Sequence, residues 1–304
     1  MNISRRQFVQ RSGLALAGSV LFSKQLLAAK SKNIITGLQL YSVRDDMRKD
    51  PLNTLKQLAA MGYKYVEHAN YINRKFYGYE AKEFRKIMDD LGLVMLSGHT
   101  ALHKKYWDES KKEFNDLWKY TVEAAAVMGQ TFVISPSMEK DDYKSPDDFK
   151  AFMDIFNKSG ELCKQSGMKF GYHNHDFEFT TKLGGELMFD LILTNTDASL
   201  VAQQLDIGNM YYVGGKALDI LNKYPNRFEL MHVKDEIKSE KGEMGGSYES
   251  TVLGKGVMPV KEIIDLGKKK GGTKYFIIEQ ESYQGLSSLD SVKEDLAVMK
   301  KWGY

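Results

Sequence analysis

The chain has 304 residues, and its 43 lysine and arginine residues against 40 aspartate and glutamate residues give a formal net charge of +3. With 42% hydrophobic and 27% charged residues it can bury a sizeable core, in one large domain or two, which excludes a disordered chain. So small a net charge does not indicate a nucleic-acid partner or a membrane surface. The single cysteine, Cys163, excludes an intrachain disulfide and a cysteine-based metal cage.

The first 30 residues have the pattern of an export signal. Arg5 and Arg6 are followed at a short distance by Phe8, then by an apolar stretch that ends in the small residues Ala28 and Ala29. The arginine pair resembles the twin-arginine signal, and the alternative is an ordinary amphipathic helix. We therefore predict a signal peptide over residues 1–30, a mature domain over residues 31–304 without a membrane span, and a periplasmic location.

From residue 34 onward, short apolar segments alternate with longer helical patterns. Glycines such as Gly62, Gly92 and Gly129 stand where a helix would end before the next strand. In chain order, the predicted strands cover residues 34–43, 63–69, 93–99, 131–136, 168–173, 200–206, 228–234 and 274–280. The predicted helices cover residues 51–59, 81–90, 111–128, 145–166, 186–194, 217–224, 260–270 and 289–302.

The strict alternation of strands and helices predicts one closed (β/α)8 TIM barrel. An open, doubly wound sheet is the competing fold, but it would normally have a glycine-rich turn after the first strand. Here Arg44-Asp45-Asp46 follows Val43 instead, which favours the barrel. The polar, glycine-containing segment 236–256 follows the seventh strand, and a connection of that length is expected to cover a site.

Histidines and carboxylates gather where the predicted strands end. Five of the six histidines lie at strand ends, and the sixth, His103, lies in the loop beyond one. In a TIM barrel the carboxyl ends of the strands form the active-site face, so these residues are expected to meet there. The histidines and acidic residues at the strand ends are Glu67, His68, His99, His173, His175, Asp176, Glu178, Asp206, His232, Asp235, Glu279 and Glu281.

Alternation along a strand places Asp206, His232 and Glu279 on the inner face of the sixth, seventh and eighth strands. Together with one group from the fifth strand they would form a mixed nitrogen and oxygen site for a single divalent ion. Mn, Zn, Co and Mg all fit such ligands, and the sequence does not choose among them. The alternative is that Asp206 and His232 only pair with each other and with Lys234 in a polar plug.

Three motifs resemble the sugar phosphate isomerase/epimerase family, within the xylose isomerase-like barrel superfamily that also includes ketose 3-epimerases, inosose dehydratases and endonuclease IV. They are Gln-Leu-Asp-Ile-Gly-Asn at 204–209, Leu-Met-His-Val-Lys-Asp at 230–235 and Ile-Ile-Glu-Gln-Glu at 277–281. The resemblance implies metal ligation by Asp206, His232 and Glu279. Where the family commonly has Glu-Asn-His on the fifth strand, this chain has His173-Asn174-His175, as inosose dehydratase-like members do. His173 is therefore expected as the fourth ligand.

These residues predict an exported enzyme that isomerises or epimerises a sugar or keto-sugar through an enediolate. The alternatives are a metal-dependent lyase or dehydratase of keto-sugars or 3-keto-glycosides, and a non-catalytic sugar-binding barrel. The carbohydrate is the expected partner, a nuclease is disfavoured by the small charge, and a homo-oligomer stays open. The expected catalytic residues are His175, Glu178 and Glu279, with Glu178 also able to replace the missing strand-five carboxylate, and the expected substrate contacts are Glu67, His68, His99 and Lys234.

Overall fold

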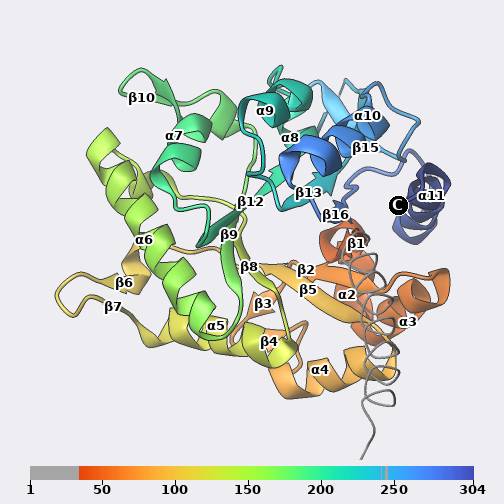
Figure 1. Cartoon of the computed structure of the whole chain (residues 1–304). Helices are drawn as coiled ribbons and strands as arrows, with labels where there is room; N and C mark the ends of the chain where they lie inside the picture. The colour runs from red at the N-terminus through yellow and green to blue at the C-terminus, as the bar shows by residue number, and fades with distance from the viewer. Residues whose placement is uncertain (1–33, 241, 244–245) are drawn as a thin grey trace, which may run out of the picture. The chain divides into compact units, whose positions relative to one another are not determined.

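The computed structural model describes residues 34–240, 242–243 and 246–304, and the predicted export signal lies outside this part of the chain. Eight parallel strands close into a barrel in the order β1-β16-β13-β12-β9-β8-β5-β2 (Figure 1), which confirms the predicted TIM barrel. The barrel strands are β1 (Ile35–Gln39), β2 (Tyr65–His68), β5 (Val94–His99), β8 (Phe132–Ser135), β9 (Lys169–His173), β12 (Val201–Asp206), β13 (Leu230–Val233) and β16 (Tyr275–Ile278).

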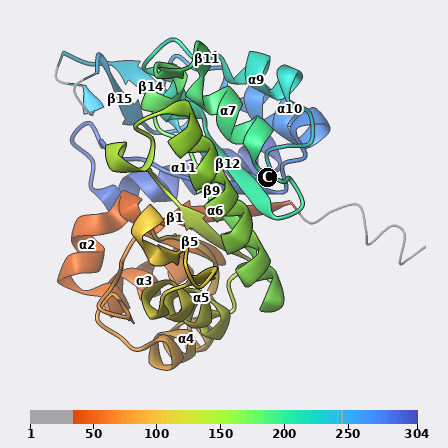
Figure 2. The same ribbon diagram turned by 90° about the vertical axis from the view of Figure 1, so that its left-hand side faces the viewer.

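Helices follow the barrel strands and pack on the outside of the barrel. The longest of them, α6, lies along β9 in both views (Figure 1, Figure 2). The α-helices are α2 (Arg44–Lys49), α3 (Pro51–Met61), α4 (Ala81–Asp90), α5 (Asp116–Met128), α6 (Pro146–Gln165), α7 (Met188–Asn195), α8 (Ile207–Tyr211), α9 (Ala217–Lys223), α10 (Val260–Leu266) and α11 (Ser288–Trp302). The other helical turns are η1 (Leu40–Val43), η2 (Lys104–Tyr106), η3 (Lys140–Asp142), η4 (Phe177–Phe179) and the π-helical η6 (Gly267–Gly271).

Among the described residues, four two-stranded antiparallel hairpins lie in the loops that follow barrel strands. They are formed by β3 (Tyr71–Ile72) with β4 (Lys75–Phe76), β6 (Trp107–Asp108) with β7 (Glu113–Phe114), β10 (Lys182–Leu183) with β11 (Glu186–Leu187), and β14 (Asp235–Lys238) with β15 (Tyr248–Thr251). Every helix in the described part of the chain is too short or too polar to cross a membrane.

Two segments differ most from the expected elements. The first strand ends at Gln39 rather than at residue 43, because the Gln39 side chain accepts a hydrogen bond from the Tyr41 backbone nitrogen (3.1 Å) and caps η1. The helix expected from residue 111 begins only at Asp116, behind Asn115 as its N-cap. Residues 111–115 belong to the β6–β7 hairpin segment instead, because Phe114 is their only apolar residue and Lys112 has a φ of 55°, outside the helical range.

The lower part of the barrel interior is apolar. A buried cluster there includes Ala202, Leu230 and Ile277 from three neighbouring strands. Leu230 stands two residues before His232, and Ile277 stands two residues before Glu279. Each predicted metal ligand therefore lies on the same face of its strand, one layer closer to the carboxyl end of the barrel. Apolar side chains thus close the barrel below, and the polar residues at the strand ends are held above them.

Candidate metal centre and active site

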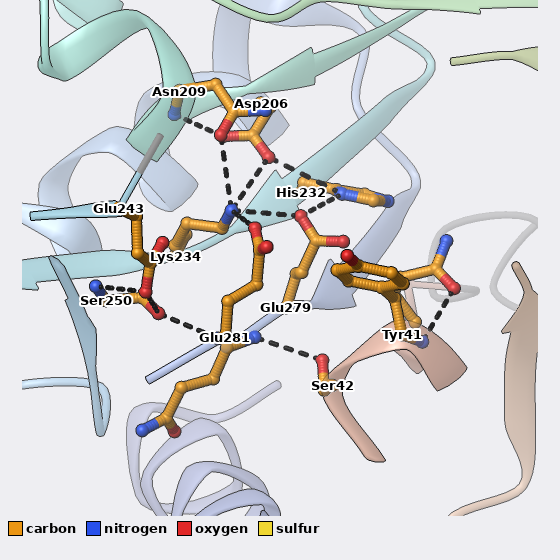
Figure 3. Close-up of polar contacts among 12 residues, drawn as sticks. Tyr41, Ser42, Asp206, Asn209, His232, Lys234, Glu243, Ser250, Glu279 and Glu281 are labelled. Carbon is orange, nitrogen blue, oxygen red and sulfur yellow. Dashed lines mark hydrogen bonds and ion pairs between the residues drawn. The ribbon is translucent and has the colours of Figure 1, made fainter. Parts of the chain in front are cut away.

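Asp206, His232 and Glu279 meet at the carboxyl ends of three adjacent strands, as the sequence predicts (Figure 3). β12 and β13 pair with Asp206 beside His232. His232 Nδ1 lies 3.1 Å from Glu279 Oε2 and 3.6 Å from Asp206 Oδ2. One nitrogen or oxygen from each side chain lies within 4.8 Å of the others, and all three residues are buried. The arrangement places three ligand types suited to a divalent ion around one point.

Only one of the two carboxylate oxygens of Asp206 accepts a hydrogen bond from the described residues. Its Oδ1 accepts a hydrogen bond from the backbone nitrogen of Asn209 (2.7 Å), at the start of α8. Its Oδ2 is buried and has no hydrogen-bond partner among the described residues. A buried carboxylate oxygen without a donor is costly unless a cation satisfies it. The Lys234 ammonium, 3.7 Å away, is too far to hydrogen-bond it, so this oxygen, with the chemistry of the donor set, fits a divalent ion.

Lys234 is the fixed cation of this cluster. Its ammonium group is fully buried and lies 2.7 Å from Glu281 Oε1 and 3.1 Å from Glu279 Oε2 (Figure 3). Burial opposes its charge, but the surrounding carboxylates, Asp206 foremost, raise the pKa of Lys234 well above its usual value. Burial also opposes ionisation of Glu279, yet the charges of Lys234 and then His232 hold its pKa well below the usual range. Lys234 therefore pairs with site carboxylates rather than with Asp235, whose side chain accepts backbone N–H groups of the following loop.

Glu67 lies beneath this cluster, fully buried at the centre of a hydrogen-bond network. Its Oε1 accepts from Gln39 Nε2 and from His232 Nε2, each at 2.7 Å. Its Oε2 accepts from Ser97 and, at 2.8 Å, from Gln204 Nε2. Burial raises the pKa of Glu67, but the histidines around it outweigh burial and hold that pKa well below the usual value. Glu67 was expected to contact substrate; its carboxylate instead fixes the ring of His232.

A second group of imidazoles joins His232 from the β5 and β9 side. One ring nitrogen from each of His99, His173 and His232 lies within 4.8 Å of the others. Gln204 Oε1 holds the first two, at 2.8 Å from His99 Nε2 and 3.1 Å from His173 Nδ1. Because Gln204 Oε1 is an acceptor, His99 Nε2 and His173 Nδ1 each carry a hydrogen. The opposite ring nitrogens, His99 Nδ1 and His173 Nε2, then keep a lone pair of the kind that can bind a metal. His173 is thus adjacent to the Asp206–His232–Glu279 group without being one of its three members.

A cavity of about 330 Å³ opens above both groups. Its walls carry imidazoles on one side and carboxylates on the other, with Tyr41 at the mouth. The lining residues are Tyr41, Ala69, His99, Pro136, His173, His175, Asn209, Glu279 and Glu281. The Nδ1 atom of His175 is buried and has no hydrogen-bond partner within the described part of the chain. Burial lowers the pKa of His175, which favours the neutral imidazole that can accept a proton.

His68 and Glu178, two of the expected site residues, take structural positions outside the cavity lining. His68 follows Glu67 on β2, so its side chain points to the opposite face, where its ring packs against Phe76 at a centroid distance of 4.9 Å. Burial lowers the pKa of His68 to about 3, and it is a neutral packing residue rather than a sugar contact. Glu178 accepts hydrogen bonds from the Tyr172 hydroxyl and, at 2.9 Å, from the His175 backbone nitrogen. It therefore supports the His175 loop from behind and does not replace the missing strand-five carboxylate.

The long segment after β13 stands beside the site, as expected. Its described residues form the β14–β15 hairpin, in which Ser250 Oγ accepts hydrogen bonds from the backbone nitrogens of Glu281 (2.7 Å) and Ser282 (3.0 Å). Glu243 in turn accepts a hydrogen bond from Ser250 Oγ (2.6 Å; Figure 3) and another from the Tyr212 hydroxyl (2.8 Å). The hairpin therefore fixes the loop that carries Glu281 into the cavity.

Comparison with known proteins gives the same architecture and names a family. The model of the xylose isomerase-like TIM barrel family matches residues 55–302. The chain belongs to this family. Among solved structures, a sugar phosphate isomerase/epimerase from Parabacteroides distasonis superposes with a TM-score of 0.74 and 27% identity, over 89% of this chain and 94% of that one. The IOLI protein, solved with a bound zinc atom, shares the fold at a TM-score of 0.69 and 12% identity, over 88% of this chain and 97% of that one.

Curated relatives include several inosose dehydratases. The protein of that name from Clostridium beijerinckii is 28% identical over 253 residues, which cover 75% of this chain and 80% of the relative. The inosose dehydratase from Geobacillus thermodenitrificans is 23% identical over 250 residues, again 75% of this chain and 80% of the relative. Relatives with isomerase and with dehydratase names thus both share this barrel.

Some of the residues that build the site were not singled out from the sequence. The Glu67 carboxylate accepts hydrogen bonds from Gln39, Ser97 and Gln204. Asn209 connects the two groups of ligands, because its side chain contacts both Lys234 (3.3 Å) and His173 (3.4 Å). For Gln204 a signal was available, because it lies two residues before Asp206 and shares its face of β12. Ser97 and Gln39 have common residue types, and nothing in their local sequence distinguishes them from structural polar residues.

Proposed function

We propose that this chain is a divalent-metal-dependent enzyme that removes the proton beside the carbonyl group of a keto-sugar. The observation that carries the proposal is the buried Oδ2 of Asp206, which has no hydrogen-bond partner among the described residues and lies 3.6 Å from His232 Nδ1 and 3.7 Å from Lys234 Nζ. Glu279 of the same cluster lines the polar cavity. Asp206, His232 and Glu279 would hold the ion, with His173 as the adjacent imidazole. A bound ion would supply Lewis-acid polarisation of the substrate carbonyl, which acidifies the neighbouring C–H group.

The chain's own residues then divide the work. His175 lines the cavity with an unpartnered ring nitrogen, so it is placed to accept the proton from carbon. Lys234 holds a fixed positive charge beside Glu279 and stabilises negative charge that develops on the substrate oxygen. Glu178 acts as a positioning residue, since it holds the backbone at His175. Glu67 fixes the His232 ring from below.

The distribution of acid and base groups favours β-elimination over isomerisation. Among the described residues that line the cavity, the carboxylates Glu279 and Glu281 both follow β16, and imidazoles occupy the β5 and β9 side. An elimination uses two unlike groups: a base that takes the α-proton, and an acid that protonates the departing oxygen as the β C–O bond breaks. The curated relatives named inosose dehydratase support the same choice. Isomerisation or epimerisation is the second candidate, supported by the relative named sugar phosphate isomerase/epimerase.

A single experiment separates the two. The metal-loaded protein is incubated in D2O with 2-keto-myo-inositol and with 3-keto-glucosides, and products are followed by NMR and by the absorbance of a conjugated enone. Elimination predicts an unsaturated product, whereas isomerisation predicts a saturated isomer that carries deuterium. His175→Ala is expected to abolish either product, and His103→Ala, which removes an imidazole that does not line the cavity, is the matched control. Absence of both products and of deuterium exchange with every substrate would refute the proposal.

We also propose that residues 1–30 direct export to the periplasm by a twin-arginine route. The support is the sequence pattern alone, with Arg5 and Arg6 ahead of an apolar stretch. Replacing both residues by lysine keeps the charge and removes the arginine pair. The double variant is expected to stay inside spheroplasts while the wild-type chain is recovered in the periplasmic fraction. Equal recovery of both from the periplasm would contradict a twin-arginine route.

A further inference from the structure

A second cavity, of about 250 Å³, opens beside the catalytic one and shares two of its wall residues. The shared residues are Tyr41 and Ala69, which follow the neighbouring strands β1 and β2. Its remaining walls combine the polar and basic residues Arg44, Arg48 and Asn70 with Leu40 and Tyr77. Because Tyr41 and Ala69 line both cavities, the two lie next to each other, and a ligand that fills the first would reach the second by passing the exposed ring of Tyr41.

Tyr41 forms the boundary between the cavities. Its side chain is 42% exposed, although it stands beside buried Leu40 and Ser42. The Arg44 guanidinium carbon lies 4.6 Å from the centre of the Tyr41 ring, so the ring is held in place while much of it stays open to solvent. A fixed aromatic face at the mouth of a polar cavity suits contact with the C–H face of a sugar ring.

Arg44 is itself anchored to the catalytic cavity. Its Nη1 donates to the Tyr41 carbonyl (3.2 Å) and to the Tyr283 hydroxyl (3.1 Å), and its Nη2 donates to the Glu281 carbonyl (3.2 Å). The second cavity is therefore tied to the loop that carries Glu281, one of the residues that line the catalytic cavity. Arg48, by contrast, is 69% exposed and pairs with Asp45 on the same helix, so it can turn towards a ligand.

We propose that this second cavity is a subsite for a second sugar ring attached to the keto-sugar. It rests on the proposed function, because the first ring must occupy the cavity above His232 and Glu279. The second ring would lie against Tyr41, and its oxygens would accept hydrogen bonds from Arg48 and Asn70. Guanidinium and amide N–H groups are suited to such oxygens. The substrate class is then a disaccharide-like keto-glycoside rather than a free monosaccharide.

The test compares matched ligands by calorimetry on the metal-loaded protein. Glucose, galactose and xylose are titrated beside cellobiose, lactose and xylobiose, and phenyl β-glucoside serves as a ligand with an aromatic second ring. For at least one pair the disaccharide is expected to bind about tenfold more tightly than its monosaccharide, as one stacked and hydrogen-bonded ring can supply. That advantage is expected to fall to less than about twofold in the double variant Arg48→Gln/Asn70→Ala, with monosaccharide affinity unchanged.

The control is Lys49→Gln, a charge removal on the same helix outside both cavities, which is expected to keep the full advantage. No advantage for any disaccharide, an advantage that survives in the double variant, or an equal gain for phenyl β-glucoside would overturn the proposal.

Exchange of the α C–H hydrogen of a monosaccharide ketose with D2O is measured in parallel. Exchange without a disaccharide advantage would refute the subsite alone. A disaccharide advantage without exchange would refute the proposed chemistry alone.

Discussion

Replacing Glu67 by glutamine tests whether the buried network holds the metal site in its working form. The carboxylate receives two hydrogen bonds of 2.7 Å on Oε1, from Gln39 and His232, and one of 2.8 Å on Oε2, from Gln204. An amide at the Oε1 position would set its NH2 group against two donors. At the Oε2 position the new NH2 group would face the Nε2 atom of Gln204, which is also a donor. The Gln204 amide cannot flip to present its oxygen, because Gln204 Oε1 would then lose its contacts with His99 and His173. Neither orientation satisfies every group.

The magnitude follows from these contacts. Loss of the partner behind a metal-binding histidine weakens metal affinity by about 10–100-fold, which corresponds to about 1.4–2.8 kcal/mol. The buried donor left without an acceptor adds a loss of about 1–3 kcal/mol in the unfolding free energy of the metal-free protein. At a metal concentration 100 times the wild-type dissociation constant, the ion stabilises wild type by about 2.7 kcal/mol, and a tenfold weaker variant by only about 1.4 kcal/mol.

Metal affinity of the purified Glu67→Gln protein is measured by calorimetry with Zn2+ and Mn2+, and urea unfolding is followed with and without the ion. Asp295→Asn is the matched control, because Asp295 is also a fully buried carboxyl and lies outside both ligand groups. It is expected to bind metal as wild type does. Wild-type metal affinity in Glu67→Gln, with or without a change in stability, would refute the positioning role of Glu67.

Three further outcomes are expected. Gly208→Ala would place a Cβ 2.5 Å from Lys234 Cδ, so we expect a loss of activity and about 1–3 kcal/mol of unfolding free energy, measured by kinetics and urea unfolding; an unaffected rate would contradict the role of Lys234. Burial raises the pKa of Asp295 from 3.8 to about 8, so the folded state binds a proton that the unfolded state releases. This group should therefore lower wild-type stability as pH rises from about 4 to 8, by an amount on the order of a few kcal/mol, and Asp295→Asn should make the slope of stability against pH shallower by that amount in urea unfolding. His173→Glu should shift metal preference from Zn2+ towards Mn2+ in competition dialysis, since a carboxylate replaces an imidazole; an unchanged ratio would show that His173 is not a ligand.

Strand alternation explains why much of the site could be predicted from the sequence. In a parallel barrel, every second residue of a strand faces inward, and strand ends meet at one edge. Asp206, His232 and Glu279 follow from that rule, and the structure brings their side chains together. The same rule, applied to adjacent residues, separates Glu67 from His68, because both cannot face the interior. A strict use of parity would therefore have removed one of them from the expected substrate contacts.

The sequence does not indicate how deep along the barrel axis each inward-facing side chain lies. Glu67 and Glu279 both face inward, but Glu67 pairs with Gln39 and Ser97 at a lower level of the barrel. Register sets this level, and it depends on a shift between β2 and β5 at Val66 and Glu67. Glu178 shows a similar limit, since its loop turns through η4 and returns its carboxylate to Tyr172 rather than to the cavity.

The two levels of the barrel explain how so many charged groups can be buried above an apolar floor. Each carboxylate that faces inward has a donor from another strand: Glu67 has Gln39, Ser97 and Gln204, and Glu279 has His232 and Lys234. Such pairing repays the cost of burial only when the donors are held rigidly, as barrel strands hold them. Asp206 Oδ2 is the exception, since it has no hydrogen-bond donor among the described residues and the Lys234 ammonium lies 3.7 Å away. Glu279, which belongs to the same cluster, lines the cavity, so a cation from solvent would reach Asp206 past Glu279, while the fully paired Glu67 supports the cluster from beneath.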